Sequence, residues 1–241
     1  MSLVKQKGNM YTWVTHCHTH LGGICPHECA YCYVQKGVAK LSGKYAGPPR
    51  LIEKELKVNY GKGKTIFIEH MNDFCAEGIP DEWITKILNH CRKYPSNAYV
   101  FQTKNPERCV SHMSEFPSRH CLGTTIETNN GMLLKKYSKA PSPLRRATAM
   151  SNLKDMGFQT FATIEPIMDF EVFDMVYLID MIDPLFVNIG ADSKHNNLPE
   201  PSAEKIEELL KELKYSGIEV REKHNLDRLL GIVKDENDTT R

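Results

Sequence analysis

Short apolar segments alternate with longer amphipathic segments along most of this chain. The apolar segments are rich in β-branched and aromatic residues and only a few residues long, as strands buried on both faces are. Strands are expected at 11–16 (YTWVTH), 65–70 (TIFIEH), 98–103 (AYVFQT), 120–127 (HCLGTTIE), 159–165 (QTFATIE) and 184–190 (PLFVNIG). The spacing leaves room for a helix after each strand, which predicts repeated βα units.

Two of the intervening segments have clear helix signals. Segment 80–94 begins with Pro80, a favoured first helical residue, and stops before Pro95. Segment 202–217 has Ser202 as its expected N-cap and Gly217 as its stop. Segment 218–233 is expected to add an edge strand and a short helix. The apolar stripe of the first helix consists of Ile84, Ile87, Leu88 and Cys91.

Repeated βα units predict an α/β fold with a parallel sheet, as either a partial barrel or a doubly wound open sheet. Both architectures place the working loops at the carboxyl ends of the strands. Polar motifs follow five successive strands here, at 22–36, 70–75, 103–108, 127–130 and 165–169. Packing alone does not explain that placement, so we expect a functional site at this edge.

Length and composition indicate one globular domain over residues 1–241. The core is expected to extend to about residue 217, with a C-terminal extension over 218–241. Apolar residues make up 41% of the chain and charged residues 25%. The formal charge of +1 gives no support to wholesale phosphate neutralisation, although a local basic groove remains open.

The sequence predicts a cytoplasmic protein without a membrane anchor. No apolar run approaches the ~20 residues of a membrane helix, and the N-terminal residues lack the apolar core of a signal peptide. Thiols stay reduced in the cytosol, so the 8 cysteines indicate metal or redox chemistry before disulfides.

Three of these cysteines lie in one short segment, residues 22–36, which we call the cluster loop. Cys25, Cys29 and Cys32 form a C-x3-C-x2-C pattern directly after the first expected strand. Iron–sulfur clusters are usually held by four thiolates. A cubane held by three leaves one iron with an open position, where chemistry can take place. Gly22 and Gly23 permit the tight entry into the loop.

The alternative to a cluster is zinc. His16, His18 and His20 share one face of the expected strand, and Cys17 and His27 are also near enough to complete a site. Zinc sites usually combine a C-x2-C pair with a second, distant pair, and the downstream sequence has no such partner. The spacing therefore favours a cluster over zinc.

The cluster loop resembles the motif of the radical S-adenosylmethionine (SAM) superfamily, because an aromatic residue precedes the last cysteine in CPHECAYC. Within that superfamily the chain is similar to the spore photoproduct lyase-like branch. The segments MNDFCAEGIPDEWI and FQTKNPER also resemble phage Gp37/Gp68-type (DUF5131-like) proteins of unknown substrate. The resemblance implies a partial (β/α)6 TIM barrel and a [4Fe–4S] cluster on Cys25, Cys29 and Cys32. It also implies SAM on the open iron, reductively cleaved to a 5′-deoxyadenosyl radical that abstracts hydrogen.

The same resemblance assigns the expected SAM pocket. The loop HMND, where the superfamily commonly has glycine-glycine-glutamate, offers its polar side chains to the amino group. The other assignments go to the ribose, the carboxylate, the adenine or the substrate. The residues assigned in this way are Tyr31, Asn72, Asp73, Thr103, Lys104, Glu127, Arg145 or Arg146, Glu165 and Asn188.

Of the remaining cysteines, Cys91 and Cys121 are expected in the core. Cys75 follows the second strand and is a candidate hydrogen donor to a product radical. The expected electron donor is a flavodoxin or a ferredoxin. The expected substrate is a nucleobase, nucleotide or nucleic acid. A small metabolite or a peptide is the alternative substrate class, and a non-catalytic zinc module is the alternative function.

Overall fold

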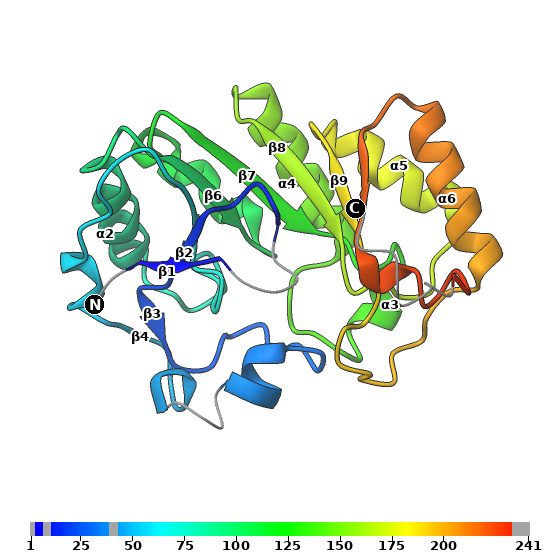
Figure 1. Cartoon of the computed structure of the whole chain (residues 1–241), viewed down its shortest axis with the longest axis horizontal. Coiled ribbons are helices and arrows are strands. Elements are labelled where there is room, and N and C mark those ends of the chain that lie inside the picture. The colour runs from blue at the N-terminus through cyan, green and yellow to red at the C-terminus, as the bar shows by residue number, and fades with distance from the viewer. Residues whose placement is uncertain (1–2, 7–10, 39–42, 233–241) are drawn as a thin grey trace, which may run out of the picture.

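The computed structural model describes residues 3–6, 11–38 and 43–232. Its main sheet has eight strands in the order β1-β2-β5-β6-β7-β8-β9-β10. All neighbouring pairs in it are parallel except β1 with β2. The bounds are β1 (Val4–Lys5), β2 (His16–His18), β5 (Thr65–Ile68), β6 (Ala98–Gln102), β7 (His120–Thr125), β8 (Thr160–Ile164), β9 (Val187–Ile189) and β10 (Val220–Glu222). The predicted parallel α/β sheet is confirmed, as a curved open sheet rather than a closed barrel (Figure 1).

The helices pack along the outer face of this sheet (Figure 1). The helix predicted after Pro80 is α2, and Pro80 is its N-cap rather than its first helical residue. Ser202 caps α6 as predicted, its hydroxyl accepting from the Lys205 amide, and Gly217 follows in a left-handed conformation. The bounds are α2 (Asp81–Arg92), α3 (Gly131–Leu134), α4 (Pro143–Asp155), α5 (Val172–Ile182) and α6 (Ala203–Tyr215).

A 3-10 helix at Pro106–Glu115 stands between β6 and β7, where the repeat predicts an α-helix. Outside the main sheet, β3 (Leu21–Gly22) pairs with β4 (Arg50–Leu51) just before the cluster loop turns away. The C-terminal segment supplies the predicted edge strand, β10, and a 3-10 turn at His224–Leu226. None of the helices in the described segments has the length and hydrophobicity that a bilayer-spanning segment requires.

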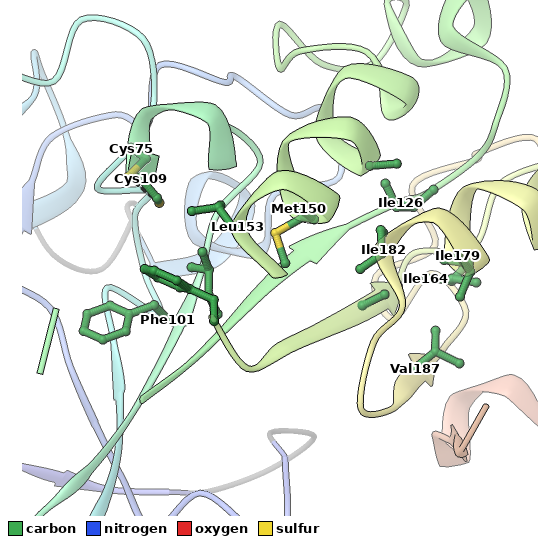
Figure 2. Close-up of a cluster of buried hydrophobic side chains, with 14 of the residues drawn as sticks. Cys75, Phe101, Cys109, Ile126, Met150, Leu153, Ile164, Ile179, Ile182 and Val187 are labelled. Carbon is green, nitrogen blue, oxygen red and sulfur yellow. Dashed lines mark hydrogen bonds between the residues drawn. The ribbon is translucent and has the colours of Figure 1, made fainter. Parts of the chain in front are cut away.

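The larger hydrophobic core lies between the sheet and its helices. Met150 and Leu153 of α4 and Ile179 and Ile182 of α5 are buried among strand residues such as Val187 (Figure 2). Full burial of such side chains contributes about 1.5–3 kcal/mol each, so this layer is the main source of stability. Its helix contacts confirm the apolar stripe predicted for α2, because Ile84, Ile87, Leu88 and Cys91 are all buried.

A second, aromatic core fills the inner face of the sheet, and it corrects the first predicted strand. Residues 11–13 do not continue β2, which covers only His16–His18. The Tyr11 ring turns inward, stacks on Phe67 at 5.9 Å and meets Phe161 edge-on at 5.8 Å. The apolar pattern at 11–16 thus reflects burial inside the sheet rather than sheet pairing. Gly123 makes space for this packing, because a Cβ there would lie 2.2 Å from the Phe161 ring.

Candidate functional site

The cluster loop leaves β3 at the carboxyl edge of the sheet, where the sequence places it. Gly23 has φ +84°, and a Cβ there would lie 2.1 Å from the Pro48 carbonyl oxygen, so only glycine fits this entry. Cys25, Cys29 and Cys32 are all free thiols with partial exposure. Two backbone turns separate them, closed by the Glu28 amide on the Cys25 carbonyl and by the Cys32 amide on the Cys29 carbonyl.

Backbone hydrogen bonds tie the cluster loop to the segment after α3. The Ala30 amide donates to the Tyr137 carbonyl at 2.7 Å, and the Lys139 amide donates to the His27 carbonyl at 2.8 Å. Between them, the Cys29 sulfur lies 3.2 Å from the Ser138 hydroxyl. These bonds hold the cluster loop against residues 137–139.

The three thiols of the cluster loop do not converge as the ligands of a single metal ion would. Within the described ranges, no three His, Cys, Asp or Glu side chains converge closely enough to hold one metal ion. The histidines that zinc would need have other partners: His27 bonds Asp73, His20 bonds Glu69, and His18 bonds the Glu55 carbonyl. Burial raises the pKa of Cys25 and Cys29. Iron or another cation would be needed to stabilise their thiolates.

Asp73 anchors the cluster loop to the ends of β5 and β6. One of its oxygens accepts from the Thr103 hydroxyl at 2.7 Å and the Cys75 amide at 3.0 Å. The other accepts from the Lys104 amide at 2.7 Å and lies 2.9 Å from His27 Nε2. Burial opposes the charged carboxylate, but His27 and these donors outweigh it and lower the pKa of Asp73. Asp73 is thus fully engaged in holding the loop.

Asn72 and Thr103 serve the same anchor. The Asn72 side chain donates to the Gly23 carbonyl at 3.2 Å and accepts from the Asp73 amide at 2.9 Å. The Thr103 hydroxyl donates its hydrogen bond to Asp73. The predicted group at the ends of β5 and β6 does come together, with its hydrogen bonds directed to the loop.

Glu127 forms a second anchor, at the end of β7. Tyr31, the aromatic residue of the cluster loop, donates its hydroxyl to one oxygen, which Lys104 also contacts. Arg146 donates to the other oxygen at 2.7 Å. Glu127 is completely buried, yet Arg146 and Lys104 hold its pKa at about 2. Four of the predicted residues therefore meet in one charged network beside the cysteines.

The two predicted arginines have different environments. Arg145 is exposed and pairs with Glu107. Arg146 is fully buried and also donates to the Thr125 and Pro141 carbonyls. Its Nη2 has no hydrogen-bond partner among the described residues, which leaves one buried donor beside Glu127 unused. Arg146 is the better placed of the two to meet an anion at this site.

Glu165 directly follows β8, and Asn188 is the middle residue of β9. Glu165 accepts from Lys223 at 2.6 Å and lies near the Asn225 amide, at 3.3 Å. Asn188 is 3% exposed, and its Nδ2 lacks a partner within the part of the chain that the structure describes. Sequence reasoning missed Lys223 and Asn225, because they follow an edge strand that carries no recognisable motif.

Cys75 does not lie at the edge of the sheet where the cluster loop and the charged network meet. It is completely buried, its sulfur is 3.3 Å from that of Cys109, and both point into the helix-side core (Figure 2). Burial also raises its pKa. The hydrogen-donor role predicted for Cys75 does not fit this position, since a donor must reach the radical that it quenches.

A buried histidine cluster behind the loop was missed as well. Glu69 accepts from the His20 and Leu21 amides at 2.7 and 3.2 Å, which fixes the chain just before the loop. His90 Nε2 donates to the Val58 carbonyl, so Nδ1 of a neutral His90 must accept from His20 Nε2, 2.8 Å away. His20 Nδ1 then needs a further proton to bond Glu69, at 2.6 Å.

Neutral His20, neutral His90 and an ionised Glu69 together carry two protons on these groups, but this hydrogen-bond pattern requires three. The alternative, in which Tyr60 donates to His20 Nε2, instead places the additional proton on His90. Burial raises the pKa of Glu69 to about 7 and lowers that of His20 to about 3, which favours the proton on Glu69. Of the three histidines at alternate positions, His20 therefore belongs to this cluster, whereas His18 contacts the Glu55 carbonyl and His16 contacts Thr15.

Comparisons with known proteins identify the family of the chain and proteins of similar fold. DUF5131, described as a protein of unknown function, matches residues 12–179. No curated protein matches the chain significantly. Spore photoproduct lyase with bound AdoMet and dinucleoside spore photoproduct is similar in structure, with a TM-score of 0.56 at 12% identity, over 86% of this chain and 63% of that one.

Streptococcus suis SuiB bound to its precursor peptide SuiA is similar over 93% of this chain, with a TM-score of 0.60 at 8% identity. The chain covers only 52% of SuiB, so both solved proteins are considerably longer. At these identities the likeness concerns the fold, the partial barrel of radical SAM enzymes. The match over residues 12–179 shows that the chain belongs to the DUF5131 family.

Proposed function

We propose that this protein is a radical SAM enzyme with a [4Fe–4S] cluster on Cys25, Cys29 and Cys32. When bound, the cluster would supply the electron that cleaves SAM to a 5′-deoxyadenosyl radical, which abstracts hydrogen from the substrate. The observation that carries the proposal is the cluster loop itself. Three cysteines lie in one short loop, at the strand ends of a partial barrel, and Asp73 and Glu127 hold that loop through His27 and Tyr31.

The charged network beside the loop suits a zwitterionic cofactor. Lys104 is 17% exposed on its side chain and is the cation of this network that solvent reaches. Together with the unused Nη2 of Arg146, it suits the carboxylate of SAM. Tyr31 lies in the loop beside them, consistent with an adenine contact. Glu127 is saturated by protein donors, so we assign it the positioning of Tyr31, Lys104 and Arg146 rather than a direct ribose contact.

Glu165, Asn188, Lys223 and Asn225 lie within or just after β8, β9 and β10 and are proposed to contact adenine or substrate. They offer amide, carboxylate and ammonium groups, which can pair with the edge of a nucleobase. The bound dinucleoside named for the similar lyase supports a nucleobase or nucleic-acid substrate. A peptide is the alternative, supported by the peptide named for SuiB, and a small metabolite remains a third class.

Anaerobic reconstitution with iron and sulfide tests the proposal. We expect about four iron and four sulfide per chain, a visible charge-transfer absorbance, and release of 5′-deoxyadenosine from SAM under dithionite. Replacement of Cys25, Cys29 and Cys32 by Ala should abolish all three signals. Cys121→Ala, which removes a cysteine outside the loop, should keep them. A chain that holds only zinc, or cleavage that survives the triple replacement, contradicts the proposal.

A further inference from the structure

Ser138 lies against the cluster loop, in the segment that follows α3. Its hydroxyl oxygen is 3.2 Å from the Cys29 sulfur, close enough for a hydrogen bond between the two atoms. Ser138 is 6% exposed, so water does not compete strongly for this contact. A side chain from a distant part of the sequence thus touches one of the three cysteines proposed to hold the cluster.

The main chain fixes the position of Ser138 on both sides. Its amide donates to the Leu134 carbonyl at 3.0 Å, at the end of α3. Its neighbours Tyr137 and Lys139 are the residues whose backbones pair with the cluster loop. The hydroxyl therefore reaches the Cys29 sulfur from a short side chain on an anchored backbone.

The other partners of Ser138 limit where its proton can go. Its oxygen accepts from the Ala140 amide at 3.1 Å, and a hydroxyl has one proton to donate. Two acceptors are within reach, the Cys29 sulfur at 3.2 Å and the His27 carbonyl at 3.5 Å. The His27 carbonyl already accepts from the Lys139 amide at 2.8 Å. The sulfur is therefore the nearer acceptor and the one with the greater need of this proton.

Ligation of iron would determine the direction of this bond. In a free thiol, either the Cys29 sulfur or the Ser138 oxygen can donate. A cysteine that holds a metal is deprotonated, so its sulfur can only accept. The Tyr31 hydroxyl also lies near this sulfur, but it donates to Glu127. Ser138 thus supplies the hydroxyl that remains available to a ligated Cys29.

We propose that Ser138 donates a hydrogen bond to the Cys29 sulfur in the loaded protein and thereby raises the reduction potential of the cluster. The inference rests on the proposed function, because it requires a cluster on Cys29. Reduction adds one electron from a reductant such as dithionite, and part of the added charge lies on the ligand sulfurs. A donor directed at such a sulfur stabilises the reduced state more than the oxidised state. Ser138 acts through Cys29, as a positioning residue.

Ser138→Ala removes the donor and keeps the backbone that pairs with the cluster loop. Wild type and variant are reconstituted anaerobically, and their midpoint potentials are measured by mediated redox titration without SAM. At a fixed ambient potential, we expect the ratio of reduced to oxidised cluster to fall about three- to tenfold in the variant. This is a shift of about 30–60 mV to a more negative potential for one electron. The iron content per chain should match that of wild type.

A vibrational measurement separates this hydrogen bond from a merely structural effect. The iron–sulfur stretching bands in a resonance Raman spectrum shift in deuterated buffer when an exchangeable proton is bonded to a ligand sulfur. We expect this deuterium shift in wild type and a smaller one in Ser138→Ala.

Ser142→Ala is the matched control. It removes another serine hydroxyl from the same segment, one that caps α4 by accepting from the Arg145 amide. Loss of this cap should lower the free energy of unfolding. The midpoint potential and the deuterium shift should stay at their wild-type values.

Each other outcome has a definite meaning. If reconstituted wild type holds no iron–sulfur cluster, the proposed function fails. If wild type holds a cluster but shows no deuterium shift, the inference is wrong whether or not Ser138→Ala takes up iron. Equal potentials in wild type and Ser138→Ala would mean that the hydroxyl bonds the His27 carbonyl instead. An equal fall in potential in Ser142→Ala would assign the effect to lost stability and also overturn the inference.

Discussion

Two buried carboxylates, Asp73 and Glu127, determine how the cluster loop is held. Each sits at a strand end, as the sequence predicts for residues that bind a cofactor. Their hydrogen bonds go to the protein instead: Asp73 to His27 and Glu127 to Tyr31. The sequence could place them at the edge of the sheet, because strand ends are readable from the apolar pattern. It could not show which donors would occupy them, because those donors come from distant segments.

Asp73→Asn should therefore disturb the loop rather than SAM binding alone. The amide leaves one oxygen to accept and turns an NH2 toward donors, so buried groups lose their partners. We expect a loss of about 2–4 kcal/mol in the free energy of unfolding, with a lower iron content after reconstitution. Denaturant titration and iron analysis measure both. Asp155→Asn, an exposed change on α4, should alter neither. Full iron retention by Asp73→Asn would contradict the anchoring role.

Lys104→Gln tests the role of a single side chain in the charged network around Glu127. Arg146 continues to neutralise Glu127, so the protein should fold and hold its cluster. The solvent-accessible cation at the network is lost, and SAM should bind about tenfold more weakly. Equilibrium binding of SAM to the reconstituted protein measures this change. Unchanged affinity would remove Lys104 from the proposed pocket.

At the scale of elements, the sequence predicts strand ends and helix caps best. It predicts least well which residues pair within the sheet and which type of helix forms. The strands β5 to β9 lie within the segments predicted for them, and Ser202 caps its helix as expected. The segment at 11–16 misled because aromatic residues signal burial in general, and Tyr11 is buried inside the sheet rather than within a strand. The 3-10 helix at Pro106–Glu115 was missed because its polar and apolar positions are also compatible with an α-helix.

The histidines of β2 and α2 make the stability of this region depend on pH. Burial lowers the pKa of His18 and His90 to about 4, from about 6.5 in the unfolded chain. Below pH 6.5 the unfolded chain takes up protons that the folded protein does not. The free energy of unfolding should thus fall between pH 6.5 and 4, by up to about 1.4 kcal/mol per pH unit for each histidine.

His18→Gln should reduce this slope by the share of one proton, and chemical denaturation of cluster-free protein across that pH range measures it. Glu69 acts in the opposite direction, because burial raises its pKa to about 7 and the folded protein retains that proton, whereas the lowered pKa of its partner His20 acts in the same direction as that of His18. A slope equal to that of wild type would show that His18 titrates normally in the folded protein.

For the whole molecule, the fold was predictable and its inner packing was not. Alternating strand and helix patterns are sufficient to predict a parallel α/β sheet with the site at one edge, and the resemblance to radical SAM enzymes adds the partial barrel. The pattern does not show that the Tyr11 hydroxyl donates to Gln102 at 2.7 Å and bonds Thr163 at 2.9 Å, linking β6 to β8 across the inner face. Such contacts depend on three segments meeting, which no single stretch of sequence encodes.

Tyr11→Phe tests this link. The ring and its stacking remain, but the Gln102 oxygen and the Thr163 hydroxyl lose a buried partner. We expect a loss of about 1–3 kcal/mol in the free energy of unfolding, measured by urea denaturation. Tyr215→Phe, at an 89% exposed position, should have no comparable effect. Equal stability of Tyr11→Phe and wild type would show that the ring alone closes the inner face.

The short ladder between residues 30–27 and 137–139 has a consequence for maturation. Small zinc domains collapse only when their ion arrives, whereas here main-chain pairing already shapes the receiving turn. Under the proposed function, this main-chain pairing would hold the turn in place while iron and sulfide are inserted, and it would keep the same turn together if oxygen removed them.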